Sequence, residues 1–313
     1  MSSFIIRRLF SAVPVLFMVA VIVFSMLRLT PGDPAAIIGG DGATTQQLEE
    51  IRRSMGLDKP VFTQFVQWMG QLLRGNLGDS LISGTPVTSL IADRINPSII
   101  LAVATVCFSV LVSLPLGILA AWRQGHFLDR IVMAGSVFGF SVPVFITGYI
   151  LIYFLSMKLG LFPVQGYKPP SDGFWPFLQR MVLPTLSLST VYIALISRIV
   201  RTSMIEVMNE DYIRTARAKG LSDRGVLLRH ALKNAAVPIV TIIGVSIAML
   251  IGGVVVTETV FNIPGLGRLV VDAILARDYP VVQALLLLFS FMYVLINLLI
   301  DLTYSLLDPR IRY

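Results

Sequence analysis

Residues 95–122 have the sequence INPSIILAVATVCFSVLVSLPLGILAAW. This stretch lies between Arg94 and Arg123, and none of its 28 residues carries a charge. A helix needs about 20 mostly apolar residues to cross the hydrocarbon core of a bilayer. The stretch therefore predicts a transmembrane helix rather than a buried helix of a soluble domain.

The composition of the whole chain points the same way. Of its 313 residues, 55% are hydrophobic and 14% are charged, and the mean hydropathy is +0.80. A soluble domain usually carries about 25% charged residues, so an ordinary soluble enzyme is excluded, and the net charge of +7 does not by itself indicate nucleic-acid binding. The single cysteine, Cys107, excludes an intramolecular disulfide, and His126 and His230 show no zinc-ligand spacing. We expect no metal site.

Five further uncharged stretches predict five further spans. They contain 19, 27, 17, 24 and 22 residues and are bounded by Arg8 and Arg28, Arg130 and Lys158, Arg180 and Arg198, Lys233 and Glu258, and Asp278 and Asp301. The 17-residue stretch counts as a span because omitting it would put the basic segments around it on opposite sides of the membrane. The first stretch exceeds the apolar core of about 7 to 15 residues in a signal peptide, so we expect a retained anchor. The prediction is an all-α membrane protein with six transmembrane helices.

The basic residues predict how these spans are oriented. Lys and Arg accumulate in short cytoplasmic loops. With a cytoplasmic N-terminus, 14 of the 25 basic residues lie inside and only five lie in the short outer loops. We therefore expect a multi-pass membrane protein with both termini in the cytoplasm. Its predicted parts are a tail and first span (1–29), an extracytoplasmic helical loop (30–97) and a five-span core (98–313).

The outer loop after the first span has helical patterns of its own. Thr44 and Gln47 fit a capping box, and Gly56 fits the end of the helix that follows. A second helix is predicted over residues 61–73. Its apolar side would contain Phe62, Phe65, Trp68, Met69 and Leu72. The pair could cap a translocation path, dock an extracytoplasmic partner, or simply cover the membrane domain.

The cytoplasmic segment between spans four and five, residues 201–236, contains DYIRTARAKG at positions 211–220. A helix is predicted to run to Lys219 and end at Gly220, because glycine readily adopts the left-handed conformation that ends helices. Ser222 can cap the next helix. DNA reading is disfavoured for a short loop between two spans, and lipid contact explains the basic residues but not the turn. A rigid lever held by another protein explains both.

This segment resembles the cytoplasmic EAA loop of ABC importer permeases, in particular the oligopeptide/dipeptide permease branch. Within the general pattern Glu-Ala-Ala-x3-Gly-x9-Ile-x-Leu-Pro, Ala216, Gly220 and Leu232 match. Further stretches resemble the same branch along essentially the whole chain: TPGDP at 30–34, FNIPGLG at 261–267, RDYP at 277–280 and DPR at 308–310.

The resemblance implies a coupling helix that docks in a groove of an ATPase subunit. The residues it assigns to this coupling loop are Arg214, Thr215, Ala216, Arg217, Gly220, Leu221, Ser222 and Asp223. It also implies a second homologous permease, two ATPase subunits that bind ATP and Mg, and an extracytoplasmic substrate-binding protein. The expected cargo is dipeptides or oligopeptides, although similar permeases carry glutathione, nickel chelates, opines or sugars.

The chain itself is not expected to hydrolyse ATP. The phosphate-binding pattern Gly-x4-Gly-Lys-Ser/Thr does not occur, so we predict a non-enzymatic subunit with no cofactor of its own and no nucleic-acid partner. The rival interpretation is a stand-alone carrier driven by an ion gradient. Such carriers place acidic or histidine side chains within their spans, whereas here Glu258, Asp278 and Asp301 only border the uncharged stretches.

The outer turn between spans five and six is a second candidate site. Pro264, Gly265, Leu266 and Gly267 precede an amphipathic stretch, residues 269–275. We interpret the turn as an outer gate or a contact for a binding protein. The alternative is that the nearby charges form exposed pairs, which contribute at most about 1 kcal/mol each.

Small residues recur at every fourth position on several spans and predict close helix packing. The longest series is Ser109, Ser113, Gly117 and Ala121. Such a seam can lie within the subunit, which is the simpler interpretation, or against a second permease.

Overall fold

A computed structural model describes residues 2–29, 35–36, 44–54 and 56–307. Within these residues the regular structure is helical, and the extended pairing is limited to one isolated bridge between Asp79 and Pro86. Four helices are long and apolar enough to cross a membrane, or five if one bent pair counts as a single span. The all-α membrane fold is confirmed for the described part of the chain.

Five long helices contain five of the six predicted spans. They are α1 (Ser2–Leu29), α5 (Val87–Trp122), α8 (Phe174–Met208), α12 (Ala236–Val260) and α14 (Tyr279–Leu307). The short 17-residue stretch lies inside the 35-residue α8, because the helix continues past the charged residues that bound the stretch. α1 contributes a shorter apolar part, Phe10–Met26.

The third predicted span is not one continuous helix. α6 (Phe127–Ser141) and the helix formed by α7 (Val144–Leu151) with the π-helix η1 (Ile152–Lys158) are bent by 104° relative to each other. The bend lies at Pro143, which lacks an amide hydrogen and disfavours a helical residue before it. This pair is either a broken span or a re-entrant loop. A 3-10 turn, η2 (Pro170–Asp172), then precedes α8.

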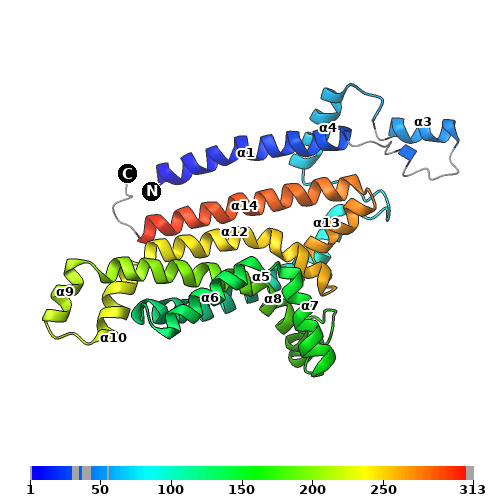
Figure 1. Cartoon of the computed structure of the whole chain (residues 1–313). Coiled ribbons are helices and arrows are strands. Elements are labelled where there is room, and N and C mark those ends of the chain that lie inside the picture. Colours follow the sequence, from blue (N-terminus) through cyan, green and yellow to red (C-terminus); the bar gives the residue numbers. More distant parts are fainter. Residues whose placement is uncertain (1, 30–34, 37–43, 55, 308–313) are drawn as a thin grey trace.

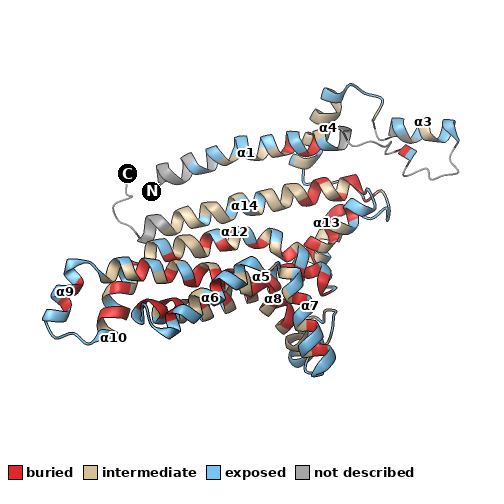
Figure 2. Cartoon of the chain, in the orientation of Figure 1, coloured by how far each residue is buried: buried red, intermediate tan, exposed pale blue. Residues whose placement is uncertain are grey.

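The small-residue seam of α5 packs against α8. Ser109, Ser113, Gly117 and Ala121 are all buried. A Cβ atom on Gly117 would lie 2.6 Å from the Cβ of Val200 on α8, so only glycine allows this approach. The interpretation of the seam as packing within the subunit is therefore confirmed. Figure 2 shows buried residues concentrated along α5, α8 and α12.

The two ends of the bundle carry different features (Figure 1). α1 begins and α14 ends at the same end as four short helices of the segment 201–236, which are α9 (Asp211–Ala218), α10 (Asp223–Gly225), η3 (Val226–Ala231) and α11 (Leu232–Asn234). There, Nη2 of Arg8 lies 3.0 Å from Oδ1 of Asp301 and joins α1 to α14. The opposite end carries α4 (Val61–Leu73) and α13 (Leu266–Leu275). This arrangement agrees with the sorting of loops that the basic residues predict.

The helical pair of the outer loop forms as predicted. α3 (Thr45–Ser54) begins at the capping box, in which the Thr44 amide donates to Oε1 of Gln47 over 2.8 Å and the Gln47 amide donates to the Thr44 hydroxyl over 3.3 Å. Gly56 follows with φ +66°. On α4, the predicted apolar side is only partly covered, since Phe62 is 77% exposed. The motifs at 30–34 and 308–310 lie outside the described residues.

Candidate functional site: the coupling loop and the outer turn

The candidate coupling loop, residues 201–236, is anchored on the helix bundle by one side of α9. Ile213 is fully buried and Ala216 is nearly so, and both belong to the apolar core that includes Val226 and Leu227 of η3. α9 and η3 are in direct contact. The loop is therefore held against the bundle by buried apolar side chains.

The turn that ends α9 has the predicted form. Gly220 adopts φ +81°, the left-handed region in which an L side chain is strained. Its amide donates to the Arg217 carbonyl over 2.9 Å, and the Leu221 amide donates to the Ala216 carbonyl over 3.4 Å. The hydroxyl of Ser222 accepts the Gly225 amide over 3.3 Å and caps α10. The predicted helix end at Gly220 and the predicted cap at Ser222 are confirmed.

Most of the residues assigned to ATPase contact are on the free side of the loop. Arg214, Thr215, Arg217, Gly220, Leu221, Ser222 and Asp223 are exposed. Ala216 instead faces the core, so it can affect the turn only through its packing against buried residues. Arg214 forms only an exposed pair with Asp211 over 3.2 Å, which leaves its guanidinium accessible.

Two exposed apolar residues on the loop were missed by the sequence interpretation. Tyr212 is 43% exposed and Leu228 is 59% exposed. Partial burial raises the pKa of the Tyr212 hydroxyl, and the charge of Glu210 acts in the same direction, so the ring stays neutral. The motif comparison overlooked them because neither residue occupies a fixed position of the pattern Glu-Ala-Ala-x3-Gly-x9-Ile-x-Leu-Pro. The free side of the loop thus combines basic and apolar groups.

An ion pair connects α8 to α6 near the coupling loop. Nε and Nη2 of Arg201 lie 2.5 and 2.8 Å from the two carboxylate oxygens of Asp129, which is buried. The Gly125 amide adds a third hydrogen bond to this carboxylate over 2.9 Å. Bidentate pairs of this kind fix orientation as well as adding energy. Seven residues, about 10 Å of helix, separate Arg201 from the end of α8.

At the other end of the bundle, the outer turn is built around Glu258. Its side chain, near the end of α12, is fully buried. The Ser98 hydroxyl on α5 donates to Oε1 over 2.5 Å, and the Arg268 amide on α13 donates to Oε2 over 3.0 Å. Ser98 in turn accepts the Leu266 amide over 2.8 Å. One carboxylate thus joins three helices.

The two glycines of the turn make this arrangement possible. A Cβ atom on Gly265 would overlap the Glu258 carboxylate, and one on Gly267 would lie 2.5 Å from the Cα of Val255. Glycine is required where backbone and carboxylate approach so closely. The sequence interpretation treated Glu258 only as the border of a span. The sequence did contain one indication of its role, because two glycines follow this isolated carboxylate within ten residues.

Asp278 stabilises the C-terminal end of α13 through hydrogen bonds. Its carboxylate is buried and accepts hydrogen bonds from the Ser80 hydroxyl and, over 3.1 Å, from the Leu81 amide. By contrast, Arg268 and Asp272 form a 3.7 Å pair that is largely exposed, as the alternative interpretation predicted. α13 is therefore held at both ends by carboxylates rather than by its surface charges.

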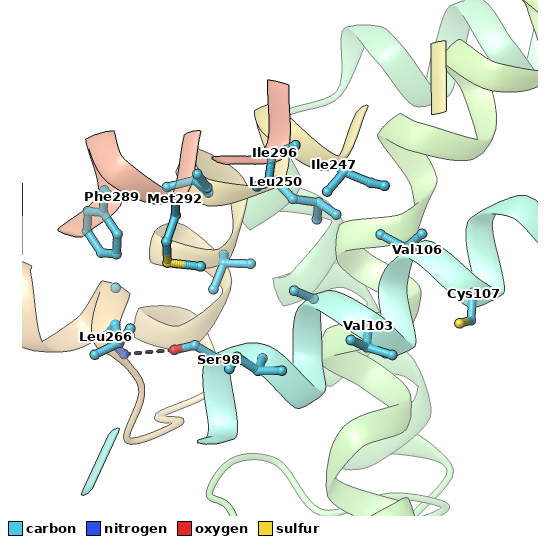
Figure 3. A pocket seen from close by; sticks show the side chains of 15 residues that line it. Ser98, Val103, Val106, Cys107, Ile247, Leu250, Leu266, Phe289, Met292 and Ile296 are labelled. Atoms are coloured by element: carbon cyan, nitrogen blue, oxygen red, sulfur yellow. Dashed lines mark hydrogen bonds between the residues drawn. The ribbon is translucent and has the colours of Figure 1, made fainter. Parts of the chain in front are cut away.

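An apolar hollow of about 330 Å³ lies between α5, α12, α13 and α14 (Figure 3). Apart from Ser98 and Cys107, its lining side chains are hydrocarbon or thioether groups, and the bond between Leu266 and Ser98 closes one side. A peptide backbone needs donors and acceptors, and this hollow supplies almost none. It is not a self-contained peptide site.

Comparison with known proteins defines the class. Residues 113–313 match the family described as binding-protein-dependent transport system inner membrane component, and residues 1–102 match the N-terminal part of a membrane component of such systems. The chain therefore belongs to the family of inner-membrane permease components of binding-protein-dependent transport systems. Members of this family are membrane-spanning subunits and are not themselves enzymes.

Individual relatives match over the full length. The probable peptide ABC transporter permease protein y4tP of Sinorhizobium fredii is 54% identical, with 100% of both chains covered. The glutathione transport system permease protein GsiC of Escherichia coli strain K12 is 41% identical, again with 100% of both chains covered.

Among solved structures, the inward-facing MetNI methionine ABC transporter has a similar fold, with a TM-score of 0.60 and 19% identity. The match covers 71% of this chain and 97% of the other.

Proposed function

We propose that the chain forms half of the translocation path of an ATP-driven ABC importer for dipeptides or oligopeptides. The observation that carries the substrate class is the 54% identity, over the whole length, to a relative named as a probable peptide ABC transporter permease. The path is completed by a second homologous permease. Two ATPase subunits bind ATP and Mg, and an extracytoplasmic protein delivers the substrate.

In this proposal the chain crosses the cytoplasmic membrane six times with both termini inside. α1, α5, α8, α12 and α14 are five of the spans, and α6 with α7 and η1 is the sixth. The basic loop at one end of the bundle and the start of α1 beside the end of α14 support this arrangement.

The coupling loop transmits ATPase movement to the spans. Its exposed basic and apolar groups suit a protein groove, while buried Ile213 and Ala216 attach it to the bundle. Closure of the ATPase pair would press on α9, and α8 and η3 would carry the displacement into the membrane. α13, fastened at both ends, acts as the outer gate and moves with α5 and α12.

Glutathione is a second candidate substrate, because relatives from Escherichia coli that are 41–42% identical are named glutathione transport system permease. Both substrates are peptides in chemical terms. The experiment is uptake into proteoliposomes that contain this chain, its second permease and the ATPases, with binding protein outside and ATP inside. We expect ATP-dependent uptake of labelled dipeptides. Uptake by this chain alone, driven by an ion gradient without ATP, would refute the proposal.

A further inference from the structure

α4 crosses the outer half of α1 (Figure 1). The ring of Phe65 lies 6.1 Å from that of Phe17 and 5.2 Å from that of Phe24, and Trp68 lies 5.5 Å from Phe24. These edge-on and tilted contacts between four rings are in the range of favourable aromatic pairs. α4 therefore packs against α1 at the height of Phe17 and Phe24.

That level lies inside the membrane. In the proposed arrangement α1 is the first span, and its uncharged stretch between positions 8 and 28 is about 30 Å long at 1.5 Å per residue, the thickness of the hydrocarbon core. Phe65 contacts both Phe17 and Phe24, so its ring sits roughly 10 Å inward from position 28. A water-soluble partner does not reach this depth, which argues against a docking surface for a binding protein.

Part of the apolar side of α4 is left uncovered by α1. Val61, Phe62, Val66 and Leu73 are between 51% and 81% exposed. The 13 residues of α4 include no charged side chain. Its polar side chains are the uncharged Thr63, Gln64, Gln67 and Gln71. A helix with an apolar and a polar side can lie in the interface, with its apolar face buried about 5–10 Å.

Beside this face lies a polar hollow of about 570 Å³. Its lining includes the basic side chains of Arg53, Lys59 and Arg74, together with Gln67 and Gln71. Lys59 donates a 3.3 Å hydrogen bond to Gln67, and in the described part of the chain no carboxylate lies within 4 Å of these three cations. Three cations without a counter-charge suit a phosphate group.

Val66 belongs to both features, because it lines the hollow and is also part of the exposed apolar side. We propose that α4 and this hollow bind one phospholipid of the outer leaflet that carries an anionic headgroup. The phosphate lies among Arg53, Lys59 and Arg74, and the acyl chains lie along Phe62 and Val66. This proposal rests on the six-span arrangement above, but not on the identity of the transported substrate.

The depth of α4 is tested on the full chain in vesicles of phosphatidylcholine and phosphatidylglycerol. In a Cys107→Ser background, spin labels are placed at Phe62→Cys and Val66→Cys, with Gln46→Cys on α3 as the water-exposed control. We expect both α4 labels to collide with oxygen and to be protected from a water-soluble nickel chelate. Access to the chelate overturns the proposal, and so does protection from both reagents, which would mean that protein covers α4.

The headgroup is tested with spin-labelled phosphatidylglycerol and phosphatidylcholine. Neutralising Arg53, Lys59 and Arg74 to Gln, singly and together, should lower association of phosphatidylglycerol about fivefold per charge, the equivalent of about 1 kcal/mol each. Phosphatidylcholine should change little, and the exposed Lys168→Gln should leave both unchanged. An undiminished preference for phosphatidylglycerol in the triple variant overturns the proposal. Uptake measured on the same variants shows separately whether the transporter still works.

Discussion

Substitution of Gly220 offers a graded test of the coupling loop. The residue adopts φ +81°, and a Cβ atom built on it meets nothing within 4 Å. A side chain here is therefore penalised only by backbone strain, of about 1–2 kcal/mol for an ordinary L residue. Asparagine tolerates this conformation better, and a branched residue tolerates it worse.

The expected order of coupling is wild type, then Gly220→Asn, then Gly220→Ala, then Gly220→Val. A strain of about 1.4 kcal/mol lowers the population of the formed turn about tenfold relative to the unformed turn. Gly225→Ala is the matched control in the same loop, because its φ is −64° and its added Cβ would make only an ordinary 3.4 Å contact with Ser222.

The measurement is the number of substrate molecules taken up per ATP hydrolysed in proteoliposomes that contain the complete transporter. Membrane insertion should be the same for all variants, because the turn lies outside the spans. Two results would refute the reasoning: normal coupling in Gly220→Val, or equal defects in Gly220→Asn and Gly220→Val.

Three further predictions concern the packing that supports the two sites. Glu258→Gln should lower the melting temperature of the purified protein in detergent, because an amide group would face the donors at Ser98 and Arg268. Hydrogen bonds to a charged group contribute about 1.5–3 kcal/mol each. An unchanged melting temperature would contradict this hydrogen-bond network. Gly117→Leu should destabilise the α5–α8 contact by about 1–3 kcal/mol or prevent folding. The control Gly252→Leu should be tolerated, because the space around the added Cβ is open. Equal melting temperatures of the two variants would argue against this packing. Asp129→Asn should cost about 1–3 kcal/mol, because the partly exposed Arg201 would lose its charged partner. Restoration of the melting temperature by Arg201→Met in the same chain would support this cause, and no loss in Asp129→Asn would refute it.

The sequence by itself determined the class of fold and the position of the turn in the proposed coupling loop. Uncharged stretches of sufficient length predict spans because a bilayer has no water to solvate charges or open backbone groups. The end of α9 at Gly220 and the cap at Ser222 were predictable because both depend on local backbone chemistry. The helix over residues 61–73 followed from its apolar periodicity in the same way.

The tertiary structure alone decided which polar residues belong together. Ser98 and Glu258 are 160 positions apart, and Arg201 and Asp129 are 72 apart, so no local pattern pairs them. The inward direction of Ala216 likewise depends on neighbouring helices. The physical reason is that hydrophobicity and backbone preference act locally and survive in any fold, whereas buried hydrogen bonds exist only between groups that the packed helices bring within about 3 Å of each other.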